Sequence, residues 1–396
     1  MRSTAVQSLV VSARTDVIGS LWPVRTLLGV MLTNARLIGD SGVRVGWLEI
    51  ADGRVAASGD GLRDGVDLGG RYVAPGFVDM HVHGGGGAAF TDDPLAVLEF
   101  HREHGTTTCL ASLVTAPIPE LVEQVAALAP LVESGLLAGV HLEGPFLAAA
   151  RRGAHDPALL RAPDAGSVAT LLDAGRGTVR MVTIAPELPG ALDAIARIVE
   201  SGAVAAIGHT DATYDEARAG LAAGATVGTH LFNAMRPLHH REPGVVGALL
   251  ESDAPCELVL DGVHVHPALA AWVMGVAAGR IALITDAIAA AGVGDGAYVL
   301  GGLGVTVRDG VARLTHGGSI AGSTLTQDAA LRNAVAAGVL LPDAVAALTA
   351  VPARALGLPV GTLDPGSRAD LVVLSEDLDV DGVMTAGSWI EQEFLV

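Results

Sequence analysis

The stretch Pro75-Gly-Phe-Val-Asp-Met-His-Val-His83 combines a predicted strand with a candidate metal site, and four glycines follow it. The apolar run ends in His81 and His83, and side chains two residues apart on a strand project from the same face. Neutral imidazole is the commonest nitrogen ligand for zinc-like cations in proteins. Two histidines can also be ordinary polar residues at a strand end, so the metal interpretation depends on partners from other strands.

The composition limits the partners and the chemistry of the chain. Its 396 residues carry a formal net charge of −19, half of them are hydrophobic, and arginine accounts for all 24 lysine-plus-arginine residues. Nucleic acids and anionic membranes bind basic surfaces, so neither is expected as a partner. Because lysine is absent from the sequence, Schiff-base catalysis, a P-loop and a carbamylated lysine bridge between metal ions are excluded.

The cysteines and the apolar segments indicate a cytoplasmic protein. Only Cys109 and Cys256 are present, so neither a disulfide framework nor a thiolate zinc site is expected. No apolar segment predicts a membrane span. Arg14, Asp16 and Arg25 interrupt the first 30 residues and argue against a signal peptide. We expect residues 1–30 to be a loose extension.

Two β-rich segments flank the middle of the chain. Residues 31–73 have the pattern of short strands, and Asp52-Gly53 between two of them is a hairpin marker. Residues 358–396 show a similar pattern. We therefore predict one small β-sandwich domain that is built from both ends of the chain.

Residues 74–357 alternate between short apolar runs and helical patterns. The apolar runs end near eight positions, which are Met80, Leu113, Leu142, Ile184, Ile207, Thr229, Leu260 and Ile284. Eight strand-plus-helix units predict the α/β class and a (β/α)8 TIM-like barrel. An open doubly wound sheet is the alternative, but no Gly-x-Gly-x-x-Gly fingerprint follows the first strand. Residues 305–314 predict a hairpin that is inserted after the eighth strand.

Polar side chains recur at the predicted strand ends, where the chemistry of such barrels takes place. Glu143, His209 and His230 can supply three ligands to a divalent metal and leave room for a water molecule, as in catalytic rather than structural sites. His81 and His83 could hold a second ion. Glu143 would then bridge the two ions in the role that a carbamylated lysine fills elsewhere.

Asp286, at the end of the eighth predicted strand, is the candidate proton shuttle. A metal lowers the pKa of its bound water to about 7. A carboxylate beside that water can take its proton and pass it to the leaving group. Asp286 could instead be a ligand of the second metal ion, or it could do both.

Two loops at the same end of the predicted barrel carry further polar residues. The loop from Asn233 to Arg241 contains two arginines and two histidines, and it is a candidate grip for a phosphate or a carboxylate. In the other loop, His155 could polarise a carbonyl group, whereas Arg151 and Arg152 are expected to face solvent.

From about Met31 onward the chain resembles the amidohydrolase superfamily, and specifically its N-acetylglucosamine-6-phosphate deacetylases. The resemblance rests on the segments Pro75-Gly-Phe-Val-Asp79, His141-Leu-Glu-Gly-Pro-Phe146, Gly208-His-Thr210, Thr229-His-Leu-Phe-Asn-Ala-Met235, Arg241-Glu-Pro-Gly244, Asp261-Gly-Val-His264, Thr285-Asp286 and Gly318-Ser-Ile-Ala-Gly-Ser323. It implies a cytoplasmic homodimer that deacetylates N-acetyl-D-glucosamine 6-phosphate in amino-sugar catabolism and cell-wall recycling. It also implies a divalent metal cofactor, with zinc expected and iron, manganese or cobalt as alternatives, at one or two ions per subunit.

The resemblance also implies roles for individual residues. Glu143, His209 and His230 would bind the catalytic metal, and Asp286 and His155 would be the catalytic residues. The residues implied to contact the sugar and its phosphate are Ala154, His155, Asn233, Ala234, Arg241, His264 and Ile320. Arg241 would act within its own subunit or across the dimer.

Two other functions stay open at this point. A different hydrolase of the superfamily would act on a cyclic amide, a nucleobase or an unphosphorylated N-acetyl sugar. A non-catalytic scaffold would keep the barrel, but it would be expected to lose the ligands that this sequence retains.

Overall fold

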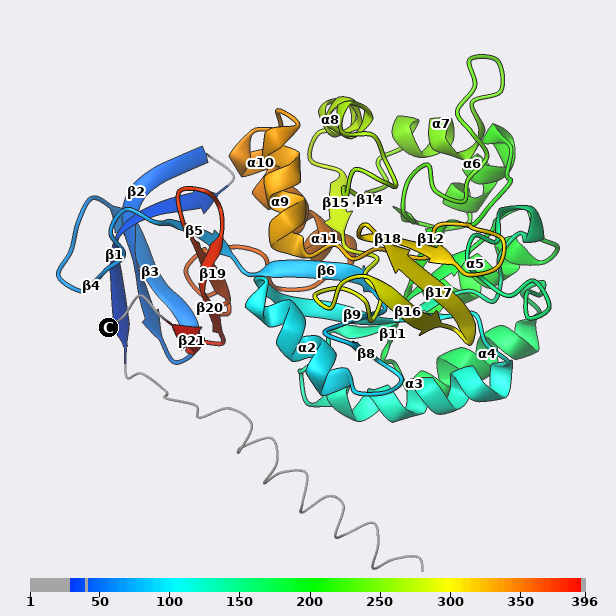
Figure 1. Ribbon diagram of the computed structural model, residues 1–396, viewed down its shortest axis with the longest axis horizontal. Helices are drawn as coiled ribbons and strands as arrows, with labels where there is room; N and C mark the ends of the chain where they lie inside the picture. Colours follow the sequence, from blue (N-terminus) through cyan, green and yellow to red (C-terminus); the bar gives the residue numbers. More distant parts are fainter. Residues whose placement is uncertain (1–28, 40–41, 393–396) are drawn as a thin grey trace, which may run out of the picture.

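The computed structural model describes residues 29–39 and 42–392, and its larger part is a parallel β-barrel (Figure 1). Eight strands pair in sequence order: β6 (Phe77–Val82), β9 (Thr106–Val114), β10 (Gly139–Glu143), β11 (Val179–Ile184), β12 (Val204–Ile207), β13 (Val227–Gly228), β14 (Cys256–Val259) and β15 (Ile281–Ile284). The first and last strands meet at their ends, where the Asp286 N–H donates to the His81 carbonyl over 2.9 Å. The predicted barrel is confirmed, because a doubly wound sheet would not pair its strands in sequence order.

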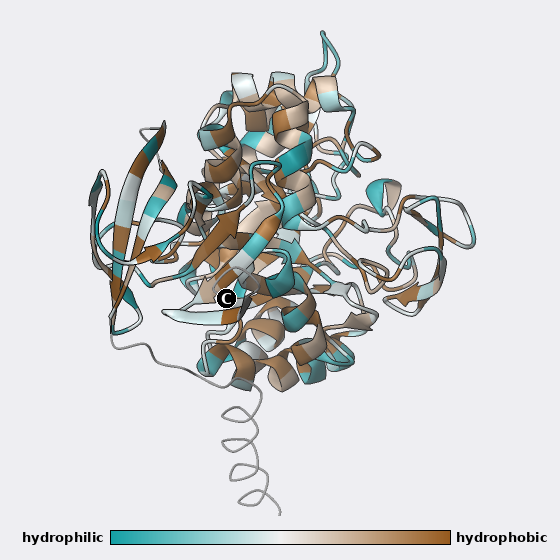
Figure 2. Ribbon diagram, turned by 60° about the vertical axis from the view of Figure 1, so that its left-hand side comes forward, coloured by the Kyte–Doolittle hydropathy of each residue, from teal (hydrophilic) through white to brown (hydrophobic). Residues whose placement is uncertain are grey.

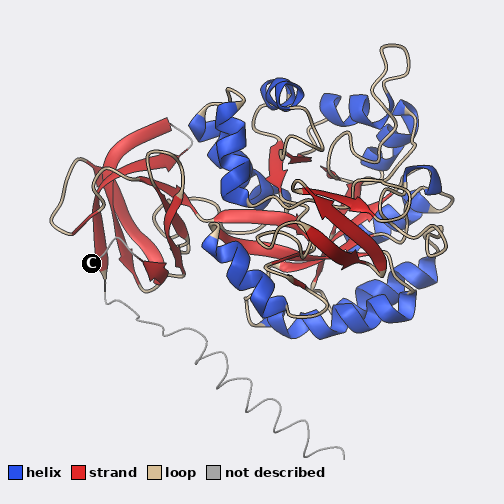
Figure 3. Cartoon of the chain, in the orientation of Figure 1, coloured by secondary structure: helices blue, strands red, loops and turns tan. Residues whose placement is uncertain are grey.

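Helices surround the barrel strands, as Figure 3 shows. They are α2 (Pro94–Glu103), α3 (Ile118–Glu133), α4 (Ala165–Gly175), α5 (Ala191–Glu200), α6 (Tyr214–Ala222), α7 (Gly244–Glu251), α8 (Pro267–Val276), α9 (Gln327–Ala336), α10 (Leu341–Leu348) and α11 (Ala350–Ala355). Helix α6 begins with a capping box, in which Thr213 and Glu216 each satisfy a backbone N–H of the other. None of the described helices is long and apolar enough to cross a membrane.

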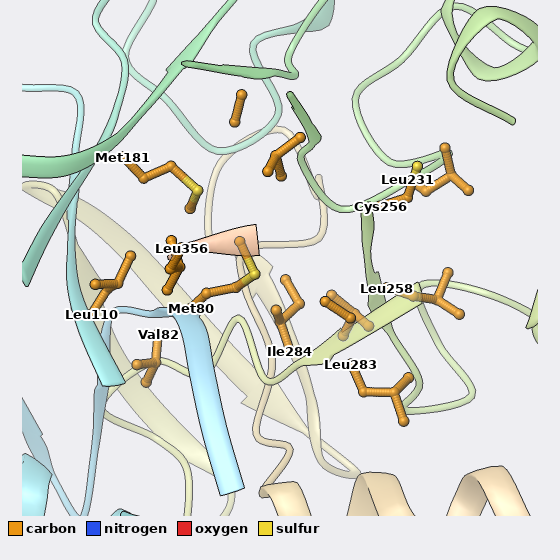
Figure 4. Close-up of a cluster of buried hydrophobic side chains, with 14 of the residues drawn as sticks. Met80, Val82, Leu110, Met181, Leu231, Cys256, Leu258, Leu283, Ile284 and Leu356 are labelled. Atoms are coloured by element: carbon orange, nitrogen blue, oxygen red, sulfur yellow. The ribbon is translucent and has the colours of Figure 1, made fainter. Parts of the chain in front are cut away.

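The interior of the barrel contains an apolar cluster and a set of buried polar side chains. Figure 4 shows a buried apolar cluster that includes Met80, Leu110 and Met181. Polar side chains form hydrogen bonds between neighbouring strands; His141, for example, bonds to Ser112 and Thr183, each at 2.9 Å. Each of these buried polar groups therefore has a partner, as burial requires.

Both cysteines are buried and free, so no disulfide links them. Burial raises the pKa of the Cys109 and Cys256 thiols to about 12. Burial therefore disfavours the thiolate form of both side chains.

The second part of the fold is a β-sheet built from both ends of the chain (Figure 1). Its strands are β1 (Val30–Gly39), β2 (Gly42–Ala51), β3 (Arg54–Asp60), β4 (Val66–Asp67), β5 (Tyr72–Pro75), β19 (Leu371–Leu374), β20 (Val380–Thr385) and β21 (Ser388–Gln392). The sheet has its own apolar core. Val55 in β3 exchanges backbone hydrogen bonds with Gly366 and Ser367, which lie shortly before β19 in the sequence. The two ends pair where β5 meets β19. The predicted domain limits stay a prediction. Of the expected extension, residues 1–30, residues 1–28 lie outside the described residues, and Val30 is the first residue of β1.

A small antiparallel sheet is inserted after β15, and it is larger than the predicted hairpin. It contains β16 (Gly296–Leu300), β17 (Leu303–Arg308) and β18 (Val311–Leu314). Strand β16 escaped prediction because most of its residues are exposed and its sequence lacks an apolar alternation. Figure 2 shows that hydrophilic and hydrophobic residues alternate along strands of the terminal sheet, whereas the helices carry residues of both kinds.

Candidate metal centre and active site

A cavity of about 310 Å³ opens at the carboxyl ends of the barrel strands. Eleven of the predicted site residues line it: His83, Glu143, Ala154, His155, His209, His230, Asn233, Ala234, His264, Asp286 and Ile320. His81 is completely buried, and its Nε2 lies 3.2 Å from Nε2 of His83. Arg241 is exposed and does not line the cavity. The geometry thus gathers all predicted site residues except Arg241.

Three of these residues converge on one point. His209 Nε2 lies 3.0 Å from Glu143 Oε1, His230 Nε2 lies 3.1 Å from that oxygen, and the two nitrogens are 2.9 Å apart. Nδ1 of His209 lies 2.9 Å from the carbonyl oxygen of Arg151, which can only accept, so we assign the proton to Nδ1 and a lone pair to Nε2. With the lone pair on Nε2, the imidazole and the carboxylate oxygen both present lone pairs to the same point, which suits a cation bound between them. The three donors therefore fit a divalent metal.

A second group of candidate metal ligands adjoins the first. Nε2 of His83 lies 3.2 Å from Asp286 Oδ1, and Nε2 of His81 lies 3.6 Å from the same oxygen. Glu143 faces both groups, because its Oε2 lies 3.3 Å from His83 and its Oε1 lies 3.4 Å from His81. The carboxylate of Glu143 is therefore placed where a bridging ligand would have to be.

The imidazole of His155 presents a donor to the cavity. His155 Nδ1 lies 2.9 Å from the Thr115 hydroxyl, which can donate or accept, and 3.3 Å from the Thr115 backbone N–H, which can only donate. We therefore assign the ring proton to Nε2. Nε2 lies 3.4 Å from Glu143 Oε2. An N–H at this place can donate to a substrate oxygen that lies over the metal ligands.

The pKa values of Asp286 and His264, which line the same cavity, shift in opposite directions. Burial would raise the pKa of Asp286, but His81 and His83 in their protonated forms outweigh it and lower the pKa, through a hydrogen bond from His83 and the charges of both rings. Burial would likewise lower the pKa of His264, but its 2.7 Å bond to Asp261 raises it. The site therefore combines an ionised carboxylate with a histidine that favours its cationic form.

Two arginines, Arg151 and Arg236, form ion pairs with the same aspartate, Asp211, at 2.8 Å and 2.9 Å. The expectation that Arg151 faces solvent is wrong, because this ion pair and its carbonyl contact with His209 hold it in place. Arg152 is exposed, as expected.

The backbone is strained where the polar side chains gather. Eleven described non-glycine residues have positive φ, and His209 (φ 47°), His230 (25°) and Asp286 (50°) are among them. Phe232 and Ala234, in the loop after β13, are two more. Such conformations cost free energy and cluster at functional sites, so this concentration supports a functional role for the strand ends.

Glu257 in β14 contacts the candidate ligands, although we did not predict it from the sequence. Its side chain is completely buried, and its Oε2 lies 2.9 Å from His81 Nδ1. The available signal was a single acidic residue within the apolar run Cys256-Glu-Leu-Val-Leu260. A buried carboxylate needs a partner, but the sequence does not indicate which.

Residues 72–390 match the model of the amidohydrolase family. The chain belongs to this family. An N-acetylgalactosamine-6-phosphate deacetylase of Escherichia coli O157:H7 is 38% identical over 86% of this chain and 95% of its own length. The N-acetylglucosamine-6-phosphate deacetylase of Homo sapiens is 36% identical over 82% of this chain and 85% of its own length. The family predicted from the motifs is confirmed.

Solved structures agree with this assignment. A variant of the N-acetyl-D-glucosamine-6-phosphate deacetylase of Mycobacterium smegmatis, in complex with N-acetyl-D-glucosamine 6-phosphate, is 50% identical with a TM-score of 0.89, over 91% of this chain and 99% of that one. The enzyme of Pasteurella multocida is 29% identical with a TM-score of 0.86, over 92% of this chain and 100% of that one. The chain is therefore a hydrolase of the amidohydrolase family, whose superfamily is metal-dependent, and the scaffold alternative is not supported.

Proposed function

We propose that this chain removes the acetyl group from N-acetyl-D-glucosamine 6-phosphate and releases D-glucosamine 6-phosphate and acetate. The reaction would serve amino-sugar catabolism and cell-wall recycling in the cytoplasm. The observation that carries the proposal is the cavity, in which the candidate metal-ligand groups His81–His83–Asp286 and Glu143–His155–His209 lie beside His230, Asn233 and His264. A structure at 50% identity holds this substrate.

Glu143, His209 and His230 would hold one divalent ion, and His81, His83 and Asp286 would hold a second. Zinc suits these nitrogen and oxygen donors, with iron, manganese or cobalt as alternatives. A bound divalent ion supplies hydroxide at neutral pH and polarises a carbonyl.

The protein side chains would supply the proton transfers. Asp286 takes the proton of the attacking water as a carboxylate, and then donates it to the leaving nitrogen. This second step is essential, since an amine anion cannot depart at neutral pH. His155 donates its Nε2–H to the amide oxygen as negative charge develops there.

The remaining cavity residues would bind the sugar and its phosphate. Asn233 and the backbone of Ala234 would hold the sugar, with Ala154 and Ile320 against it, and His264 would interact with the sugar or its phosphate. These residues lie on loops and strand ends around the metal ligands, so they can fix the acetamide in a reactive position.

We further propose that the chain acts as a homodimer and that Arg241 contacts the phosphate of the partner's substrate. Within its own subunit, Arg241 is exposed, and its Nη1 lies 2.7 Å from the ring of His240. The loop that carries it projects from the barrel near α7 (Figure 1). An arginine that does not reach its own cavity, on a projecting loop, is suited to reach another.

Acetate release by metal-reconstituted protein tests the function. N-acetyl-D-glucosamine 6-phosphate should be the best substrate, and the unphosphorylated sugar should be much poorer. N-acetyl-D-galactosamine 6-phosphate, suggested by the Escherichia coli relative, differs only at C4 and is the second candidate. Faster turnover of the galactosamine derivative would reassign the substrate, and no acetate from either phosphorylated sugar would refute the proposal.

A further inference from the structure

Glu257 is a buried carboxylate that the proposed reaction does not use. It lies in β14 with a side-chain exposure of 0%. Its Oε2 lies 2.9 Å from Nδ1 of His81 and accepts the backbone N–H of His230 over 3.1 Å. One oxygen atom therefore contacts a residue from each of the two groups of metal ligands.

These contacts determine the protonation of His81. Oε2 of Glu257 already accepts from His230, so it also acts as the acceptor toward His81, and Nδ1 of His81 carries the proton. A neutral imidazole protonated at Nδ1 has its lone pair on Nε2. Nε2 faces His83 at 3.2 Å and Glu143 at 3.4 Å. The lone pair of His81 thus points into the second ligand group.

The hydrogen bond between Glu257 and the backbone of His230 has a second effect, on the conformation of the chain. His230 has a φ of 25°, which is unfavourable for a residue with a side chain. A hydrogen bond from its backbone N–H to a buried acceptor holds the chain in this conformation. Nε2 of His230 then lies 3.1 Å from Glu143 Oε1.

We propose that Glu257 is a positioning residue of the metal centre, which holds His81 in its ligating tautomer and fixes the backbone of His230. The proposal rests on the metal centre of the proposed function. Residues that hydrogen-bond to metal ligands typically contribute about 10- to 100-fold to metal affinity. A purely structural buried carboxylate would affect folding stability but not metal affinity.

The two oxygens of Glu257 differ in their contacts, so three variants can separate a positioning role from a purely structural one. Among the described residues, Oε1 has no hydrogen-bond partner. Glu257→Gln can therefore place its carbonyl oxygen at the position of Oε2 and its amide nitrogen at that of Oε1, and it keeps both hydrogen bonds. Glu257→Leu removes both bonds. Glu257→Asp keeps the carboxylate but withdraws it from His81.

Asp79 provides a matched control, because it is also completely buried and near His81 in sequence. Its carboxylate accepts the backbone N–H of His81 at 3.2 Å and the hydroxyl of Thr285 at 2.6 Å. Among the described residues, none of its hydrogen bonds involves the imidazole of a candidate metal ligand. Asp79→Asn keeps an oxygen that can accept the N–H of His81, so it should leave metal affinity nearly unchanged.

The experiment is a titration of chelator-treated full-length protein with Zn²⁺ alone, followed by calorimetry, with circular dichroism and thermal unfolding as checks of the fold. Glu257→Leu and Glu257→Asp should weaken Zn²⁺ binding by about 10- to 100-fold, whereas Glu257→Gln should stay within about threefold. If Glu257→Leu does not fold, Glu257→Asp still tests the proposal, because it retains the charge and polarity of the side chain. Unchanged Zn²⁺ affinity in Glu257→Asp would overturn the proposal. Because no substrate is present, an error in the proposed reaction would not affect the result.

Discussion

The two oxygens of Asp286 face different partners: Oδ1 lies 3.2 Å from Nε2 of His83, and Oδ2 lies 4.0 Å from Nε2 of His264. One oxygen is therefore directed at the second ligand group and the other toward a residue of the substrate cavity. Ligation by Oδ1 would leave Oδ2 available for a proton. The two roles that the sequence left open for Asp286 are thus compatible in space.

Replacement of Asp286 by asparagine should separate these roles. Asp286→Asn removes the group that carries the proton but leaves Glu143, His209 and His230 in place. We expect turnover to fall by about 10²- to 10⁴-fold, while at least one metal ion and substrate binding are retained. Elemental analysis and substrate titration check retention. Near-normal turnover would move the proton transfer to His155 or His264.

The position of Glu143 between the two ligand groups makes a distinct prediction about metal content. Glu143→Gln should lower the occupancy of both groups, whereas His209→Asn should affect mainly the group formed with His230. Both variants should lose activity yet remain folded, because the ligands lie at the end of the barrel. Elemental analysis measures the metal occupancy, and circular dichroism shows whether the variants remain folded. Full occupancy in both variants would mean that the metal lies elsewhere.

Much of this site could be predicted because a parallel barrel brings all its strand ends to one face. His209 and Asp286 belong to strands far apart in sequence, yet each follows an apolar run by two residues, and this repetition was visible. The contact of Glu257 with His81 joins residues 176 positions apart, and no spacing reveals which partner a buried acid will find. The position of Arg241 depends on a projecting loop, whose conformation has no periodic signal.

A buried carboxylate outside the active site predicts how stability depends on pH. Asp328, at the start of α9, has a side-chain exposure of 9% and bonds to His104 at 3.1 Å and to Arg332 at 3.0 Å. Burial would raise its pKa, but these bonds outweigh burial and hold the pKa well below the usual value of 3.8. The resulting stability is present above that value and is lost as the pH falls through the lowered pKa.

Asp328→Asn should therefore reduce the free energy of unfolding by about 1–3 kcal/mol at neutral pH. The difference from wild type should shrink as the solution is acidified below pH about 4. Urea unfolding of the metal-free proteins at several pH values measures this, and the exposed Asp377→Asn serves as the control. If the difference in the free energy of unfolding between Asp328→Asn and wild type stays constant on acidification, the lost stability does not depend on the charge of Asp328.

Arg241 gives the last prediction, which tests both its ligand and its subunit. Arg241→Gln should lower kcat/KM for the phosphorylated sugar by roughly ten- to a hundredfold, because charge-assisted hydrogen bonds to the phosphate are lost. The unphosphorylated sugar should be nearly unaffected, and so should both substrates in Arg152→Gln, a control at another exposed arginine. Equal losses on both sugars would indicate a structural role.

Subunit exchange between Arg241→Gln and Asp286→Asn then distinguishes the two placements of the arginine. If Arg241 acts across the dimer, a mixed dimer contains one site with an intact Asp286 and an intact arginine from the partner subunit. Mixing the two impaired variants should then restore activity, toward about one quarter of wild type when equal amounts exchange at random. If Arg241 acts within its own subunit, every site in the mixture keeps one defect. Activity that stays at the average of the two variants, in mixtures whose exchange is verified by mass spectrometry, would exclude the action of Arg241 across the dimer.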